Sequence, residues 1–334
     1  MRLTDTLHLR RNRSVQHHSR IRSALALGAG MLCSCAAFAA QVKPEIEVLV
    51  SGTAHQALFA LDFEGDRGIA VGSHGEAQVT EDGGKTWVGQ QLPTNLALLG
   101  LDTNSARTIA VGQAGVVLLK NGDGEWEEVD SGTEKRLFSV SSNIGGLSVA
   151  VGEFGAMQLS EDGGRTWHSL TLDWMQIGTD GGAEPHLYSV NVSADGAVTA
   201  VGEFGLIMRS ADRGRTWTVR SRGTASLFDI QILDDGRGFA VGQDGYALKT
   251  FDHGVTWVCL DIGSKAILNG VYADGSGRVY VSAMREMVVS SDGGMTWSLV
   301  DHDEITTIWY VGIGSAGQDI LAVGQAGRII RVGS

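Results

Sequence analysis

Short runs of alternating apolar and polar residues fill the chain from about residue 45 onward. Residues 187–192 alternate apolar and polar side chains, which is the pattern of a strand buried on one face. Three runs of similar length follow at 197–202, 206–210 and 216–220, and turns that contain glycine separate them. Helical spacing of apolar residues is not evident beyond the first 40 residues. The pattern therefore predicts an all-β protein in which each unit contributes four short antiparallel strands.

Two motifs recur at a nearly constant step. The first, Ala-Val-Gly-x-x-Gly, begins at Ala70, Ala110, Ala150, Ala200, Ala240 and Ala322, with a divergent copy at Tyr280. The second, Ser/Thr-x-Asp-x-Gly-x-Thr-Trp, covers residues 80–87, 160–167, 210–217, 250–257 and 290–297, with a shortened copy at 122–126. Copies of the first motif are 40, 40, 50, 40, 40 and 42 residues apart. A step of about 40 residues is the signature of a radial or stacked repeat.

Counting the units predicts a closed ring. The innermost strands are expected to begin near Ala57, Leu96, Arg136, Leu187, Leu227, Ile267 and Ile305. The seventh unit ends without a fourth strand, whereas residues 45–52 resemble residues 126–133, the fourth strand of another unit. We expect this N-terminal strand to complete the last sheet, which leaves no wide-open edge. The predicted fold is a seven-bladed β-propeller with four-stranded antiparallel blades, formed by residues 40–334 as a single domain.

The second motif is expected to fasten a hairpin turn. Its aspartate can accept hydrogen bonds from backbone N–H groups of the same turn, and the glycines tolerate positive φ. The threonine hydroxyl can bond to this turn, and the tryptophan can pack between blades. We assign these structural roles to Asp82, Asp162, Asp212, Asp252, Asp292, Trp87, Trp167, Trp217, Trp257 and Trp297. No catalytic or metal site is expected there, because a metal needs several carboxylates that converge on one point.

The first 39 residues differ in composition from the rest. Six arginines and one acidic residue precede an apolar run that includes Ala37-Phe38-Ala39, the small-x-small pattern of a secretory cleavage site. We expect residues 1–39 to be a signal peptide that is cleaved after Ala39. A loose lipoprotein box ends at Cys35, so cleavage before Cys35 with acylation of that cysteine is the alternative. The protein is therefore expected to be exported to the periplasm, with a lipid anchor in the second case.

Charge and cysteine content narrow the range of partners. The formal net charge is −12, and removal of residues 1–39, with six arginines and one aspartate, moves it to about −17. So acidic a body is a poor match for nucleic acid or an anionic lipid surface. We expect a protein partner, at most peripheral contact with a membrane, and a monomer. Only Cys259 lies outside the signal peptide, so the chain cleaved after Ala39 cannot form an internal disulfide. No metal or other cofactor is expected.

The pairing of both motifs in nearly every unit resembles the Asp-box (BNR) repeat propellers. Within that group, residues 45–334 look most like the photosystem II stability and assembly factor family, in a form found in bacteria that do not photosynthesise. The resemblance implies an exported, non-enzymatic scaffold that holds a membrane-protein subunit during assembly. It implies no particular binding residues, because no partner-contact motif aligns unambiguously.

The variable residues of the first motif are expected to lie on one face of the ring, together with the links between blades. Polar side chains at the first variable position, among them Glu153 and Glu203, are expected to bond mainly to the turn backbone. Phe154 and Phe204 occupy the second variable position of adjacent blades. Aromatic side chains exposed at such turns are the better candidates for recognition of a partner.

Two departures from the repeat add to this face. In the divergent copy Ser282 and Arg285 replace both glycines, so a different turn is expected to present Arg285. The 50-residue step reflects an insertion at 173–185, which includes Trp174 and is either a functional loop or a length variant. Removal of residues 174–184 is expected to leave the fold intact and to abolish capture of the partner. The hypothesis is a partner-binding surface formed by Phe154, Phe204, Trp174, Arg285, Glu153 and Glu203, with no catalytic residue.

Two other functions remain as alternatives. A sialidase-like glycoside hydrolase needs three arginines that converge on a carboxylate, a tyrosine nucleophile supported by a glutamate, and an aspartate that acts as the acid. It usually carries Phe/Tyr-Arg-Ile-Pro, and no Arg-Ile-Pro occurs in this sequence. Arginines do cluster around the fourth unit, at Arg209, Arg213, Arg215, Arg220 and Arg222, but alternation spreads them over both sheet faces. An accessory protein of an envelope transporter would use the same propeller face as a scaffold.

Overall fold

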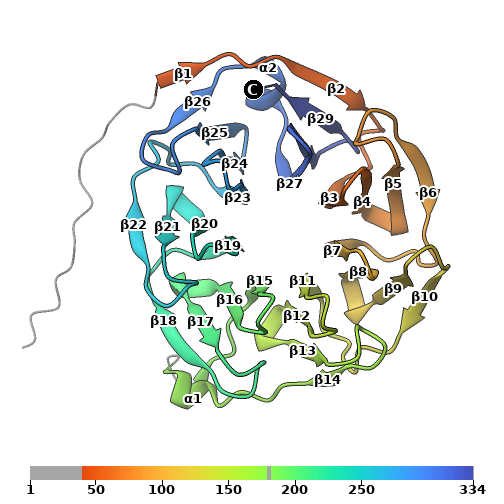
Figure 1. The fold of residues 1–334 in the computed structure, drawn as a ribbon, viewed down its shortest axis with the longest axis vertical. Coiled ribbons are helices and arrows are strands. Elements are labelled where there is room, and N and C mark those ends of the chain that lie inside the picture. The colour runs from red at the N-terminus through yellow and green to blue at the C-terminus, as the bar shows by residue number, and fades with distance from the viewer. Residues whose placement is uncertain (1–39, 179–181, 334) are drawn as a thin grey trace, which may run out of the picture. The chain divides into compact units, whose positions relative to one another are not determined.

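A computed structural model describes residues 40–178 and 182–333, and the predicted signal peptide lies outside them. Seven sheets are arranged around a central axis, as Figure 1 shows, and the chain passes through them in order. In each sheet four antiparallel strands run from an innermost strand near the axis outward to the rim, and one sheet has a fifth strand that is parallel to its neighbour. The predicted seven-bladed β-propeller with four-stranded antiparallel blades is confirmed.

The first four blades have the same strand order. Blade one contains β3 (Leu58–Glu64), β4 (Arg67–Gly72), β5 (Glu76–Thr80) and β6 (Val88–Gln91). Blade two contains β7 (Leu98–Asn104), β8 (Arg107–Gly112), β9 (Val117–Asn121) and β10 (Trp126–Val129). Blade three contains β11 (Leu137–Ser142), β12 (Ser148–Gly152), β13 (Met157–Ser160) and β14 (His168–Ser169). Blade four contains β15 (Leu187–Val192), β16 (Val198–Gly202), β17 (Ile207–Ser210) and β18 (Thr218–Ser221).

The last three blades include both strands of the N-terminal segment. Blade five contains β19 (Leu227–Ile232), β20 (Gly238–Gly242), β21 (Ala247–Thr250) and β22 (Val258–Leu260). Blade six contains β23 (Leu268–Ala273), β24 (Val279–Ala283), β25 (Glu286–Ser290), β26 (Ser298–Val300) and β1 (Ala40–Val42). Blade seven contains β27 (Tyr310–Ala316), β28 (Asp319–Gly324), β29 (Ile329–Val332) and β2 (Ile46–Val50).

The N-terminal segment closes the ring as predicted. β2 pairs antiparallel with β29, with Ile46 opposite Val332. Arg331 Nη1 donates to Glu47 Oε2 across this pair at 2.7 Å. A second contact was not predicted: β1 pairs in parallel with β26 and gives blade six a fifth strand. The segment therefore joins the sixth and seventh blades as well as completing the seventh.

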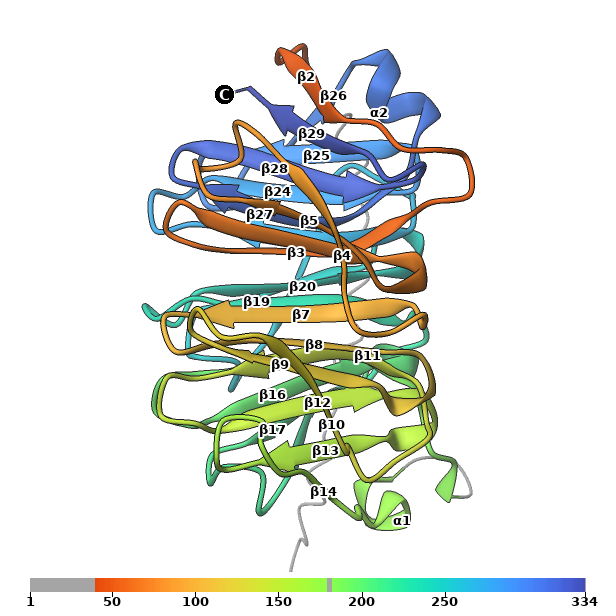
Figure 2. The same cartoon turned by 90° about the vertical axis from the view of Figure 1, so that its right-hand side faces the viewer.

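The hydrophobic core is divided into seven clusters, one between each pair of neighbouring blades. Between blades two and three, Ile109 and Leu119 pack against Leu137 and Val140, and Trp167 covers the edge of the cluster. Figure 2 shows from the side how the strands of successive blades stack against one another. Because each blade is buried only by its neighbours, the ring depends on every contact between blades.

The Asp turns have the predicted hydrogen bonds. In blade four, Asp212 Oδ1 accepts from Thr216 N at 2.8 Å and from Ser210 Oγ at 2.7 Å, while Oδ2 accepts from Thr216 Oγ1 at 2.6 Å. These bonds, with Thr216 first, lower the pKa of Asp212 to about 2. The same three partners surround the aspartates of blades one, three, five and six, namely Asp82, Asp162, Asp252 and Asp292.

Two short helices replace segments that the strand pattern did not resolve. α1 (Trp174–Ile177) lies in the insertion, at the outer edge of blades three and four. α2 (Asp303–Thr307) precedes blade seven, so the prediction that the last innermost strand begins near Ile305 was wrong by one helix turn. His302 caps α2 by accepting from Glu304 N, and the acidic first turn suits a helix N-terminus. Ile305 is a buried residue of α2 and is not the first residue of the strand.

Candidate protein-binding face

The turns between second and third strands gather at one face of the ring, hereafter the turn face. Five of them are single 3-10 turns, at Ser73–Gly75, Gln113–Gly115, Glu153–Gly155, Glu203–Gly205 and Gln243–Gly245. The second variable residue of each has a positive φ, 49° in Phe154 and 58° in Phe204. These two phenylalanines are 54% and 57% exposed. A left-handed backbone is unusual for a bulky residue, so the turn holds both rings at the surface against a conformational preference.

The first variable residues Glu153 and Glu203 bond to backbone N–H groups at the start of the innermost strand and not, as predicted, to the backbone of the turn itself. Glu153 Oε1 accepts from Arg136 N at 2.9 Å, where the innermost strand of blade three begins. Glu203 Oε2 accepts from His186 N at 2.9 Å in the same way in blade four. Each glutamate thus fixes its turn to its own inner strand. Contact of Glu153 or Glu203 with a partner stays a prediction.

Phe154 is held by groups from two other segments. Its backbone N–H donates to His186 Nδ1 at 2.9 Å, and its carbonyl accepts from Lys135 Nζ at 2.8 Å. The ring of Phe154 lies edge-on to His186, with centroids 4.7 Å apart. Lys135 is also paired with Glu184 at 3.3 Å. The exposed ring is therefore part of an ordered network and not an isolated surface residue.

A chain of aromatic contacts leads from Phe154 toward the axis of the ring. His186 meets Tyr188 at 6.1 Å between centroids and Phe138 at 6.2 Å. Tyr188 in turn meets Phe138 at 5.6 Å and Phe228 at 5.0 Å. We call these five residues, from blades three to five, the aromatic cluster. It connects an exposed turn with the start of three innermost strands.

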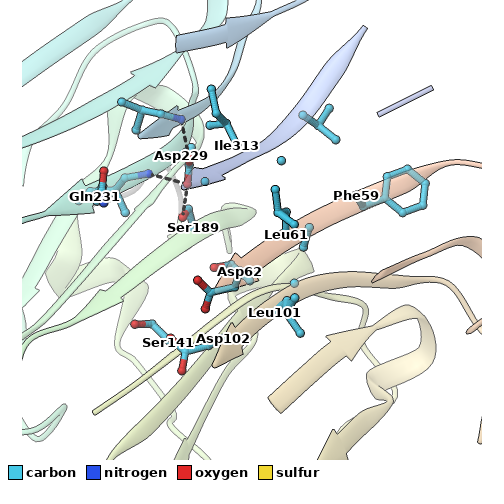
Figure 3. A pocket seen from close by; sticks show the side chains of 18 of the residues that line it. Phe59, Leu61, Asp62, Leu101, Asp102, Ser141, Ser189, Asp229, Gln231 and Ile313 are labelled. Carbon is cyan, nitrogen blue, oxygen red and sulfur yellow. Dashed lines mark hydrogen bonds between the residues drawn. The ribbon is translucent and has the colours of Figure 1, made fainter. Parts of the chain in front are cut away.

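A central cavity of about 430 Å³ begins where the aromatic cluster ends. All seven innermost strands line it, and Phe138, Tyr188 and Phe228 lie at the ends of their strands nearest the turn face. Asp62, Asp102 and Asp229 line the cavity further along the strands, as the close view in Figure 3 shows. The cavity thus has an aromatic entrance on the turn face and a polar interior.

The three aspartates also join neighbouring blades. Asp62 Oδ2 accepts from Thr103 N at 2.7 Å, and Asp102 Oδ2 accepts from Ser142 Oγ at 2.5 Å. Asp229 accepts from Ser189 Oγ at 2.8 Å on one side and from Val271 N at 2.9 Å on the other.

Burial raises the pKa of all three carboxyls. The pKa of Asp62 rises to about 8, first through burial and then through the nearby charge of Asp102. The pKa values of Asp102 and Asp229 rise to about 6, chiefly through burial. Loss of contact with water penalises the charged form of a carboxylate. The hydrogen bonds to neighbouring blades oppose this effect without cancelling it.

Trp174 is buried and not exposed on the turn face. It is only 7% exposed and packs into the cluster between blades three and four, with Leu159 and Met157. Asp173 caps the helix that carries Trp174 by accepting a hydrogen bond from Gln176 N. The expectation was that removal of residues 174–184 leaves the fold intact; the burial of Trp174 predicts instead that this removal opens the core and destabilises the propeller. Residues 179–181 lie outside the described residues.

Arg285 lies on the turn face but far around the ring from Phe154. Leu268 pairs with Ala283 as Leu58 pairs with Gly72, so Ala283 takes the position of the first glycine and the second glycine has no counterpart. The turn is a two-residue hairpin with Arg285 at φ 57°. The prediction of a different turn that exposes Arg285 is confirmed, whereas the assignment of Ser282 to a glycine position was wrong.

The other basic residues do not build a substrate clamp. Arg213 and Arg215 share Glu161 at 3.7 and 3.8 Å, and Arg209 donates to the carbonyl of His253. None of the described residues that line the central cavity is an arginine. Within the described ranges, no group of His, Cys, Asp and Glu is placed to hold a metal ion. No helix in the same ranges is long and apolar enough to cross a membrane.

Sequence reasoning missed most of the aromatic cluster. Phe138, Tyr188 and Phe228 are all the second residue of an innermost strand, as is Phe59 in blade one. This recurrence was visible once the units were aligned. On its own, however, it does not indicate a site, because a half-buried aromatic residue on a strand is ordinarily part of the core. The ring arrangement instead brings these positions together at one opening.

Comparisons with known proteins agree on the architecture. No protein-family model matches the sequence, and no curated protein matches it. The structure of YCF48 bound to D1 peptide is 18% identical with a TM-score of 0.69, over 91% of this chain and 100% of that chain. YCF48 from Cyanidioschyzon merolae is also 18% identical, with a TM-score of 0.67 over 86% and 98% of the two chains. The RRP9 WD40 repeats are 9% identical, with a TM-score of 0.69 over 87% and 99%. At such identities the likeness establishes a fold: this chain is a β-propeller of the architecture found in YCF48 and in WD40-repeat proteins.

Proposed function

We propose that this protein is an exported, non-enzymatic scaffold that binds a subunit of a membrane or envelope complex through its turn face. The observation that carries the proposal is the aromatic cluster, which continues from an exposed turn to the opening of the central cavity. In this cluster Phe154 is exposed and the other four residues are half-buried. Exposed aromatic side chains on a rigid scaffold are typical of a site that recognises another protein. Phe204, in the adjacent blade, extends the exposed apolar area.

Four further observations support this proposal. YCF48, which has the same architecture, is described with a bound D1 peptide, and the sequence resembles photosystem II assembly factors. Export and a periplasmic location follow from the signal-like residues 1–39. The acidic body disfavours nucleic acid.

Cross-linking of the tagged protein in its native envelope tests the proposal. We expect one or a few envelope subunits to be trapped, and to be lost when Phe154→Ala and Phe204→Ala are combined. Phe251→Ala is the matched control, because Phe251 is 62% exposed and lies at an Asp turn, on the opposite face. Folding of each variant is checked by its melting temperature. An unchanged set of trapped proteins in the folded double variant would overturn the proposal.

The non-enzymatic part of the proposal has its own test. A panel of fluorogenic sialosides is incubated with the purified protein, and we expect no turnover above that of a denatured sample. Turnover that is lost in Arg285→Ala would instead favour the hydrolase.

A further inference from the structure

The described lining of the central cavity contains acidic side chains and no basic residue. Three carboxylates, those of Asp62, Asp102 and Asp229, face into it together with amides and hydroxyls. Among the described residues that line the cavity there is no lysine, arginine or histidine. By contrast, Asp274 outside the cavity forms an ion pair with Arg278 at 2.7 Å. Within the described ranges the lining is thus acidic and has no basic residue of its own, although Arg107, which lies outside the lining, opposes the rise in the pKa of Asp102.

The hydrogen bonds between blades leave part of each carboxylate unused. Asp62 accepts one bond on each oxygen, from Phe63 N and Thr103 N. Asp229 Oδ2 accepts a single bond, from Val271 N. An ionised carboxylate has about four acceptor positions. These aspartates can therefore keep the blades joined and still accept a hydrogen bond from a group inside the cavity.

The entrance is lined by side chains that favour a cation. Phe138, Tyr188 and Phe228 reach the cavity from three adjacent blades, and Phe59 stacks on Trp309 at 6.5 Å on the other side of the ring. The face of an aromatic ring attracts a lysine or arginine head group, and the attraction grows as water is excluded. The volume of about 430 Å³ lies within the ~300–1,000 Å³ range of ligand sites.

We propose that the central cavity receives a lysine or arginine side chain of the protein bound on the turn face. The proposal rests on the proposed function, since the aromatic cluster leads from that face into the cavity. The aliphatic stem would pass Phe138, Tyr188 and Phe228, and the charged head would meet Asp62 and Asp102. Neutralisation by the incoming cation would also remove the energetic penalty of ionised carboxylates at this depth. The partner segment is therefore basic at the residue that enters the cavity.

Small probes test this without knowledge of the partner. Binding of Nα-acetyl-arginine amide and Nα-acetyl-lysine amide to the unmodified protein is measured by saturation-transfer NMR. The citrulline and norleucine analogues serve as uncharged controls of nearly the same shape. We expect transfer to the two cations, with mutual competition, and little transfer to the controls. Equal transfer to charged and uncharged probes, or to none of them, would overturn the proposal on the wild-type protein alone.

Variants place the binding in the cavity. Asp62→Asn should weaken binding of the arginine probe by about tenfold, the scale of one charged hydrogen bond, and Phe228→Leu should weaken it as well. The control combines Glu125→Gln and Glu128→Gln, which removes two exposed carboxylates at the outer strand of blade two. Binding that persists unchanged in both cavity variants, or that falls equally in the control, would also overturn the proposal. Because the probes need no partner, this result is independent of whether Phe154→Ala and Phe204→Ala abolish capture.

Discussion

The indole of Trp174 lies directly against Gly155, so closely that a Cβ at position 155 would be 2.6 Å from Trp174 Cζ2. Gly155 also has a φ of +66°, a conformation that glycine adopts without a steric penalty. The helix of the insertion is thus seated on the turn that presents Phe154. Gly155 N also donates to the carbonyl of Pro185 at 2.8 Å, so folding of the insertion and the shape of the candidate face are coupled through direct contacts.

Trp174→Ala should therefore destabilise the propeller. Removal of a large buried aromatic side chain costs about 3–5 kcal/mol in unfolding free energy, and the cavity would open between blades three and four. Urea unfolding measures this change. Met175 is the neighbour of Trp174 on the same helix and is exposed, so Met175→Ala is the matched control. This variant should change the unfolding free energy by less than about 0.5 kcal/mol. Equal stability of the two variants would contradict a structural role for Trp174.

The raised pKa values in the central cavity predict a loss of stability at alkaline pH. Asp62 has a pKa of about 8 and Asp102 of about 6 in the folded chain, against roughly 4 in an unfolded one. Between those values the folded state binds more protons, so the unfolding free energy falls as pH rises. We expect the melting temperature to decline from about pH 5 to pH 9. In Asp62→Asn the decline should be shallower, and an identical slope in that variant would contradict the assignment.

The Asp turns predict the opposite trend at acid pH. Their aspartates have lowered pKa values, about 2 for Asp212, because the turn donates hydrogen bonds to the carboxylate. This stabilisation is present above the unfolded pKa of roughly 4 and is lost as pH falls toward 2. Asp212→Ala should lower the melting temperature at neutral pH by a few degrees and leave it nearly unchanged at pH 2. If Asp212→Ala had the melting temperature of the wild type at neutral pH, the hydrogen bonds of this turn would not stabilise the fold.

The sequence predicted those features that repeat, because each unit repeats the same hydrogen bonds and apolar positions. The strand count, the Asp turns and the return of residues 46–50 to β29 all follow from comparing one unit with another. The features that it did not predict arise from single contacts without a repeat. β1 has three residues and no pattern of its own, Trp174 is buried only because α1 folds back, and Ala283 shifts the blade-six turn by one position.

The candidate site shows the same limit. Phe154 and Phe204 were predictable, since a bulky residue at a turn is unexpected and exposed. The cavity aspartates were not, because Asp62, Asp102 and Asp229 are separated by 40 residues or more and line one cavity only in the folded ring. Their raised pKa values depend on that closure, which buries them and places Asp102 near Asp62.

Two truncations of the N-terminal segment distinguish what β1 and β2 each contribute to the stability of the closed ring. Removal of residues 40–43 deletes only β1, whose parallel pairing with β26 covers three residues at an edge. The melting temperature should fall slightly. Removal of residues 40–50 also deletes β2, exposes the edge of β29 and leaves Arg331 without Glu47. Because every blade is buried by its neighbours, the loss should spread around the ring.

Circular dichroism and size-exclusion chromatography compare the two truncated proteins. We expect the longer truncation to melt at a much lower temperature and to associate through the exposed edge of β29. The shorter truncation should remain monomeric and nearly as stable as the full chain. If both truncated proteins had melting temperatures near that of the wild type, blade seven would be stable with three strands. Closure of the ring would then not depend on β2.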